Sequence, residues 1–106
     1  MAVVVKANAS EFKQTVQDNK LVLVDFYADW CGPCRALGPI LDEVAEKYDN
    51  VRVVKINVDE NSELAKEYRV RSIPQMFLIK EGENVESMIG MQSTSALSER
   101  IDKHIS

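Results

Sequence analysis

Ala28-Asp29-Trp30-Cys31-Gly32-Pro33-Cys34 is the stretch from which the fold of this chain can be worked out, and it holds both cysteines. An apolar run, Leu21 to Tyr27, precedes it, and apolar residues with helical spacing, Leu37 to Tyr48, follow it. The cysteines therefore lie at a predicted junction between a strand and a helix. Two cysteines separated by two residues in this context are typical of a redox-active dithiol.

The bulk composition is that of a folded globular protein. The chain has 106 residues, 45% hydrophobic and 28% charged, which is enough to bury one core. Its net charge of −4 argues against a nucleic-acid or anionic-membrane surface, which needs clustered Lys and Arg. No stretch approaches the roughly 18 apolar residues of a membrane span, and Met1 to Asn8 does not resemble a signal peptide. We therefore expect one domain over residues 1–106, located in the cytoplasm, where disulfides are usually transient and catalytic.

Hydrophobic patterning predicts strands and helices in alternation. The strands are expected at residues 3–5, 21–24, 51–58, 76–79 and 85–89. The helices are expected to begin at Asn8 or Ser10, at the cysteine motif with Pro33 in the first turn, at Asn61 or Ser62, and at Thr94 or Ser95. Their inward faces are expected to be the apolar side chains repeating every three or four residues: Phe12 and Val16; Leu37, Ile40, Leu41, Val44, Ala45 and Tyr48; Leu64, Ala65 and Tyr68; Leu97, Ile101 and Ile105.

The order βαβαβαββα predicts an α/β fold with a central mixed five-stranded sheet flanked by four helices. Helical crossovers make the early strands parallel, and a turn at Glu81-Gly82 pairs the last two strands antiparallel. His104, near the end of the last helix, is interpreted as a surface cation favoured by the helix dipole.

Two structural roles for the cysteines fit the sequence less well than a redox role. A structural zinc site takes four ligands, and this chain offers two cysteines and one distant histidine. A disulfide that closes so small a loop removes only about 2 kcal/mol of unfolded-state entropy, against about 4.7 kcal/mol for a hundred-residue loop. We therefore predict a redox pair and no metal site.

Redox exchange requires one exposed, activated thiol and a second thiol that resolves the mixed disulfide. Pro33 suits the first turn of a helix, where its missing N–H has no partner to lose. Cys31 would then lie at the helix N-terminus, where free N–H groups and the macrodipole favour a thiolate. Because Cys34 is tethered beside it, resolution would be intramolecular.

At Trp30-Cys31-Gly32-Pro33-Cys34 the sequence resembles the thioredoxin family, and the similarity extends over essentially the whole chain. The further matching segments, in the family's order, are Asp25–Trp30, Pro39–Glu43, Lys55–Asp59, Ile73-Pro74 and Gly90. The resemblance implies the thioredoxin fold and a protein-disulfide reductase in which Cys31 attacks target disulfides and Cys34 resolves them. The product would be a Cys31–Cys34 disulfide. Implied partners are disulfide-containing proteins and a flavin-containing thioredoxin reductase that uses NADPH. The chain itself would then bind no cofactor. It is also expected to act as a monomer.

The resemblance also assigns roles around the dithiol. Asp25 is implied to be a buried acid that accepts the proton of Cys34, with Lys55 nearby. The residue pattern alone fits equally an aspartate at a strand edge that points to solvent. Pro74 is implied to be a cis-proline facing the cysteines, although from sequence it is also compatible with an ordinary strand-start proline.

The remaining implied residues concern redox potential and substrate binding. The Gly32-Pro33 dipeptide resembles that of strongly reducing family members and is expected to tune the potential. An apolar surface is expected to receive an extended polypeptide through main-chain pairing. Its expected members are Trp30, Gly32, Pro33, Ile73, Pro74, Ile89 and Gly90.

Two other functions remain open from the sequence. The first is a non-catalytic scaffold that uses the same surface for protein interaction, which the presence of both cysteines and Asp25 disfavours. The second is an oxidase or isomerase domain, which the Gly-Pro dipeptide disfavours.

Overall fold

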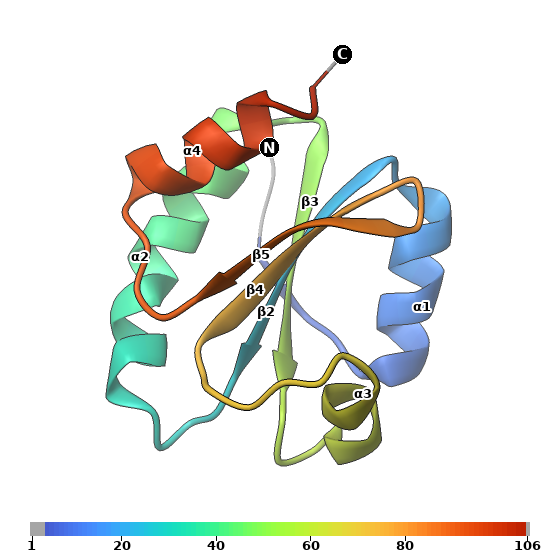
Figure 1. The fold of residues 1–106 in the computed structure, drawn as a ribbon, viewed down its shortest axis with the longest axis vertical. Coiled ribbons are helices and arrows are strands. Elements are labelled where there is room, and N and C mark those ends of the chain that lie inside the picture. Colours follow the sequence, from blue (N-terminus) through green and yellow to red (C-terminus); the bar gives the residue numbers. More distant parts are fainter. Residues whose placement is uncertain (1–3, 106) are drawn as a thin grey trace.

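Within residues 4–105, the part of the chain that the computed structural model describes, five strands and four helices alternate (Figure 1). The strands are β1 Val5–Lys6, β2 Leu21–Tyr27, β3 Val51–Asn57, β4 Gln75–Lys80 and β5 Glu83–Ile89. The helices are α1 Ala9–Asp18, α2 Gly32–Lys47, α3 Ser62–Glu67 and α4 Thr94–Asp102. The predicted order βαβαβαββα is confirmed.

The strands form one mixed sheet in the order β1-β3-β2-β4-β5. β1 and β2 both run parallel to β3, whereas β4 runs antiparallel to β2 and β5 antiparallel to β4. The parallel early strands and the final hairpin agree with the prediction. β2 lies at the centre of the sheet, and this explains why every one of its seven residues is buried.

Helices cover both faces of the sheet, α2 and α4 on one and α1 and α3 on the other (Figure 1). Because side chains alternate along a strand, Leu21 and Leu23 of β2 pack toward α2 and α4, whereas Val22, Val24 and Phe26 pack toward α1 and α3. Two apolar cores result, one on each side of the sheet.

Local sequence sets where the helices begin and which side they bury. Asn8 caps α1 by accepting the N–H of Glu11, and the Glu11 carboxylate accepts the N–H of Asn8 in return, which settles the choice between Asn8 and Ser10. In α2 the predicted stripe is buried throughout, except that Ile40 is half-buried. Met76 and Met88 fill gaps in the same core.

Two ends of the fold differ from the predictions. The first strand was expected at residues 3–5; Val3 lies outside the described residues, and the strand that pairs with β3 is Val5–Lys6. The prediction that Ile105 continues the buried face of the last helix is wrong. α4 ends at Asp102, so helical spacing no longer applies, and Ile105 is 38% exposed.

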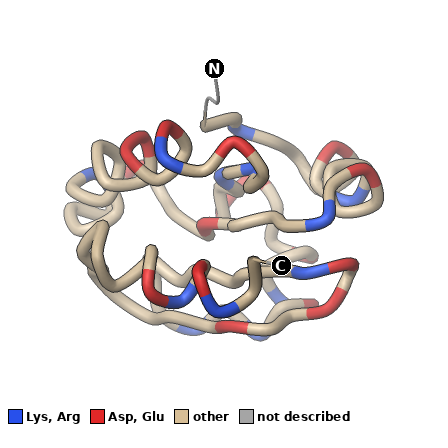
Figure 2. Tube along the Cα trace, turned by 90° about the horizontal axis from the view of Figure 1, so that it is seen from above, with Lys and Arg blue, Asp and Glu red and all other residues tan. Residues whose placement is uncertain are grey.

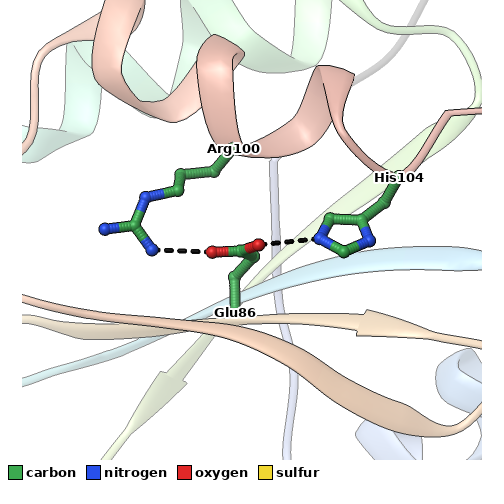
Figure 3. Close-up of polar contacts among 3 residues, drawn as sticks. All are labelled: Glu86, Arg100 and His104. Atoms are coloured by element: carbon green, nitrogen blue, oxygen red, sulfur yellow. Dashed lines mark hydrogen bonds and ion pairs between the residues drawn. The ribbon is translucent and has the colours of Figure 1, made fainter.

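His104 does not lie free on the surface, as was expected. Its ring is half-buried and Nε2 lies 2.7 Å from Glu86 Oε2, while Arg100 donates to Glu86 Oε1 at 2.6 Å (Figure 3). The three side chains therefore connect the C-terminal end of α4 to the edge strand β5. Helical spacing does not predict this contact, because Glu86 lies on another element, β5.

The described surface carries charges of both signs. Figure 2 shows acidic and basic positions interspersed along the chain trace rather than gathered on one side. Among the described helices, none has the length and apolar character needed to cross a bilayer.

Candidate active site

The two cysteines lie where the central strand passes into the second helix. β2 ends at Tyr27, and α2 begins at Gly32 with Cys31 as its N-cap and Pro33 in its first turn. Cys31 and Cys34 are disulfide-bonded, with their Cα atoms 5.2 Å apart. The backbone N–H of Cys34, which has no acceptor within the helix because it lies in the first turn, donates to Cys31 Sγ at 3.2 Å. The predicted placement of Cys31 at the helix N-terminus is confirmed.

The two sulfurs are both largely covered, although to different degrees. Cys31 is 5% exposed and Cys34 is 1% exposed in this disulfide form. They form a small apolar cluster with Tyr27 and Ala28, against which Val58 and Ile73 pack. The exposed attacking thiol that was expected is not seen in this disulfide form, in which both residues are buried and Cys31 is slightly the less so.

Asp25 is fully buried in β2, so it is not an aspartate at a strand edge pointing to solvent. Its carboxylate oxygens accept no hydrogen bond from the described residues. Burial raises the pKa of Asp25 to about 7, and the positive charge of Lys55 opposes part of that rise. Lys55 is the residue beside Asp25 in the parallel β2–β3 pair, and its ammonium lies 4.3 Å from the centre of the Tyr27 ring.

The loop before β4 lies against the disulfide. Figure 1 shows the β2–α2 connection and the α3–β4 connection at the same end of the sheet. The Ile73-Pro74 peptide bond is cis, and the carbonyl oxygen of Ile73 is 3.9 Å from Cys31 Sγ. The N–H of Gly90 donates to the carbonyl of Pro74 at 2.8 Å, and Gly90 has φ +86°, a conformation that favours glycine.

The residues of the expected substrate surface differ in how far they reach solvent. Trp30 and Ile89 are 69% and 60% exposed, and Gly32 and Pro33 are also exposed. Ile73 is half-buried and Pro74 is buried. Beside the disulfide, an apolar hollow of about 220 Å³ is lined by Trp30, Val58, Ala65, Val70, Arg71 and Ile73.

Three further hydrogen bonds at the site were not predicted from the sequence. The indole N–H of Trp30 donates to Asp59 Oδ2 at 2.9 Å, and Asn57 Oδ1 accepts the N–H of Asp59 at 2.8 Å. Arg35 donates to the carbonyl of Asp29 at 2.8 Å, across the loop that carries Cys31. Asp59 directly follows the strand predicted at residues 51–58, and this position was the available signal for it. No comparable pattern in the sequence indicates that Arg35 donates to the backbone carbonyl of Asp29.

A disulfide between closely spaced cysteines at a helix N-terminus, beside a cis-proline loop on this sheet, defines a thiol–disulfide oxidoreductase. The family model described as Thioredoxin matches residues 3–103. Thioredoxin 1 of Synechococcus elongatus is 43% identical over 107 residues, covering 99% of this chain and 100% of that one. Thioredoxin of Pyropia yezoensis is 50% identical over 99 residues, covering 92% of each chain.

Solved structures agree with these sequence matches. A mutant thioredoxin from Halobacterium salinarum superposes with a TM-score of 0.92 at 41% identity, covering 97% of this chain and 91% of that one. The oxidized form of mitochondrial thioredoxin 3 from Saccharomyces cerevisiae gives 0.86 at 37% identity, covering 94% of each chain. The chain belongs to the thioredoxin family, and it has the thioredoxin fold.

Family membership and the disulfide together establish the chemistry. The protein is a thiol–disulfide oxidoreductase, a disulfide reductase whose redox centre is the Cys31–Cys34 pair. The dithiol itself carries the electrons, and thioredoxins bind no cofactor.

Proposed function

We propose that Cys31 is the attacking thiol and Cys34 the resolving thiol in the reduction of protein disulfides. The observation that carries this assignment is the position of Cys31 as N-cap of α2, with the Cys34 N–H directed at its sulfur. A negative charge on Cys31 Sγ would be stabilised by that hydrogen bond and by the helix dipole. The sulfur of Cys34 has no equivalent position, because it lies inside the first turn and is more deeply buried.

The proposed reaction has two thiol–disulfide exchange steps. The Cys31 thiolate attacks one sulfur of the target disulfide, a mixed disulfide forms, and the other target sulfur leaves and takes up a proton. Cys34 then loses its proton and attacks Cys31 Sγ, which releases the second target thiol and leaves the Cys31–Cys34 disulfide. Two electrons pass from the dithiol to the target.

Asp25 is the proposed acceptor of the Cys34 proton. Its side chain is fully buried and accepts no hydrogen bond from the described residues, and its pKa of about 7 lets it take up and release a proton near neutral pH. Lys55, its neighbour across β2 and β3, is proposed to moderate that pKa. Gly32 and Pro33 are proposed to tune the redox potential through the geometry of the first helical turn.

The surface around the disulfide is proposed to bind an extended segment of the target polypeptide. Trp30 and Ile89 supply exposed apolar area, while the Ile73-Pro74 loop brings backbone groups beside Cys31. Gly90 belongs to this surface because its N–H is bonded to Pro74. We call this surface the substrate groove. Pairing of the target's backbone with the groove would account for a broad range of targets.

The proposed partners are disulfide-containing proteins and a flavin-containing thioredoxin reductase that regenerates the dithiol with NADPH. The relatives named thioredoxin support this pairing. We further propose that the chain acts as a monomeric single domain in the cytoplasm, a compartment in which a catalytic dithiol is kept reduced.

Trapping of the mixed disulfide tests the assignment of the cysteines. We expect Cys34→Ser to accumulate a covalent complex with insulin, because the resolving thiol is absent, and Cys31→Ser to accumulate none. Non-reducing electrophoresis and mass spectrometry measure the complex. Trapping by Cys31→Ser, or by both variants equally, would reverse or remove the assignment.

Stopped-flow kinetics test the role of Asp25. We expect Asp25→Ala to slow resolution of the mixed disulfide more than its formation, because only resolution requires Cys34 to lose its proton. Equal slowing of both steps would count against Asp25 as the proton acceptor.

A further inference from the structure

Met91 is an exposed methionine on the loop that follows β5, and the residue before it is hydrogen-bonded to the cis-proline loop beside Cys31. Its neighbour Gly90 donates to the Pro74 carbonyl at 2.8 Å, and Ile73, bonded to Pro74, has its carbonyl 3.9 Å from Cys31 Sγ. The chain turns at Gly90, where φ is +86°. The backbone hydrogen bond therefore holds the Ile89–Met91 segment against the cis-proline loop.

The exposure of Met91 is unlike that of the methionines in the core. Met91 is 46% exposed, whereas Met76 is fully buried and Met88 is 3% exposed. Within the described residues, the large apolar side chains that reach solvent are Val5, Trp30, Ile89, Met91 and Ile105. Of these five, Trp30 directly precedes Cys31, and Ile89 and Met91 flank Gly90, which is hydrogen-bonded to the cis-proline loop.

We propose that Met91 is a peroxide-sensitive contact of the substrate groove, whose oxidation to the sulfoxide weakens binding of polypeptide substrates without altering the dithiol. This inference rests on the proposed function of the groove. A methionine side chain is unbranched and polarizable, so it adapts to differently shaped apolar partners. Met91 follows the exposed Ile89 in the chain, one residue past the turn at Gly90.

The chemical step is an oxygen transfer from a hydroperoxide. A lone pair of the Met91 sulfur attacks one peroxide oxygen, the S–O bond forms and the O–O bond breaks. The attacked oxygen releases its proton and the second oxygen leaves and takes up a proton, so that one water is formed when the oxidant is hydrogen peroxide. The sulfur loses two electrons and the peroxide gains them. The product is polar and chiral, which disrupts an apolar contact.

The first experiment compares substitutions in dithiothreitol-driven turnover of two substrates, insulin and the small hydroxyethyl disulfide. Only insulin has polypeptide that can occupy the groove. For Met91→Gln we expect the ratio of the insulin kcat/KM to the hydroxyethyl disulfide kcat/KM to fall about fourfold, which corresponds to the loss of about one buried CH₂ group. Ile105→Gln makes a similar change at an apolar side chain outside the groove, 38% exposed, and should leave the ratio unchanged.

The second experiment oxidises the protein itself. Hydrogen peroxide is applied to the disulfide form, in which neither cysteine has a thiolate to react. Peptide mapping should place one added oxygen on Met91 well before Met76 or Met88. The substrate ratio of the treated parent should fall as in Met91→Gln and recover after treatment with the two methionine sulfoxide reductases, one for each epimer. Treated and untreated Met91→Leu should give the same ratio, because leucine has no sulfur.

Ile89→Ser distinguishes a failure of the Met91 proposal from a failure of the proposed groove. Ile89→Ser should also lower the substrate ratio if the groove binds polypeptide. An unchanged ratio for Ile89→Ser would overturn the groove itself. A lowered ratio for Ile89→Ser with no effect of Met91→Gln would overturn the role of Met91 alone. Oxidation of Met91 no faster than that of Met76, or an oxidised parent with an unchanged ratio, would overturn the peroxide sensitivity.

Discussion

At the scale of single residues, Asp25 is buried in a way that disfavours folding and that supports its proposed role as a proton acceptor. A carboxyl group with 0% exposure and no hydrogen bond from the described residues is unfavourable in its charged form. The positive charge of Lys55 offsets only part of the unfavourable free energy of burying the carboxylate, since the pKa of Asp25 is still raised to about 7. A fold selected for stability alone would place an apolar residue here. The same burial gives the carboxyl a proton affinity matched to exchange near neutral pH.

The raised pKa of Asp25 predicts how stability changes with pH. Between its ordinary value of 3.8 and about 7 the folded protein binds more protons at this site than the unfolded chain. Stability is therefore retained at low pH and lost as the pH rises toward 7. Relative to Asp25→Asn, the free energy of unfolding of the parent should fall by about 4 kcal/mol between pH 4 and pH 8.

Urea denaturation of the disulfide form of both proteins, at several pH values, measures this difference. Asp18→Asn, at an exposed aspartate, provides the control and should follow the parent. A difference between parent and Asp25→Asn that stays constant with pH would contradict the assignment of the raised pKa to Asp25.

At the scale of elements, α4 is held against the sheet by polar contacts as well as by its apolar face. Leu97 and Ile101 pack into the core, and Glu86 of β5 adds hydrogen bonds with Arg100 and His104 (Figure 3). Tyr48 at the end of α2 donates to Asp102 Oδ1 at 2.6 Å, so α4 is also tied to its neighbouring helix. These polar contacts fix the C-terminal part of α4 over the edge strand of the sheet.

The contacts of Glu86 predict a contribution to folding stability that is lost at acidic pH. Hydrogen bonds from His104 and Arg100 lower the pKa of Glu86 below its ordinary 4.5, so the stabilisation is present above that value and is lost as the pH falls through the lower one. Glu86→Gln should lower the free energy of unfolding at pH 7 by about 1 kcal/mol or less, because Arg100 is partly exposed. At pH 3 the effect should be smaller.

Thermal or urea denaturation at the two pH values checks the Glu86 prediction. Glu83→Gln lies on the same strand and replaces an exposed carboxylate that has no ion pair within residues 4–105, so it should have little effect. An effect of Glu86→Gln that is equal at pH 7 and pH 3 would show that the side chain acts through its shape and not its charge.

At the scale of the whole molecule, one sheet separates two cores, and the redox centre lies at its end. The disulfide joins residues only three apart, so it contributes little to holding the molecule together. The cores on the two faces of the sheet supply the stability, and the dithiol is free to cycle without loss of the fold.

Reduction should therefore have a modest effect on global stability. Opening so small a loop is expected to lower the free energy of unfolding by about 2 kcal/mol, and the protein should remain folded. Urea denaturation with and without dithiothreitol measures the change, and Cys34→Ser, which cannot form the disulfide, should show none. Unfolding of the parent by the reductant alone would contradict this prediction.

The sequence by itself determined the order of elements and the location of the dithiol. Periodicity in α2 and the apolar run of β2 are local signals, and Cys31 and Cys34 lie between them, so their place at a helix N-terminus followed from neighbours in the chain. Asp25, Pro74 and Gly90 were connected to the cysteines only by resemblance to a family, because patterns within one element do not show which side chains are buried together.

Only the tertiary structure decided which distant residues meet. The sheet order places β2 between β3 and β4, which buries Asp25 and puts Lys55 beside it. The same packing brings Asp59 to Trp30 and holds Gly90 against Pro74. It also gives His104 a partner in Glu86, a pairing that helical spacing does not predict. The physical reason is that a spacing rule describes one element at a time, whereas burial and hydrogen-bond partners arise when separate elements pack together.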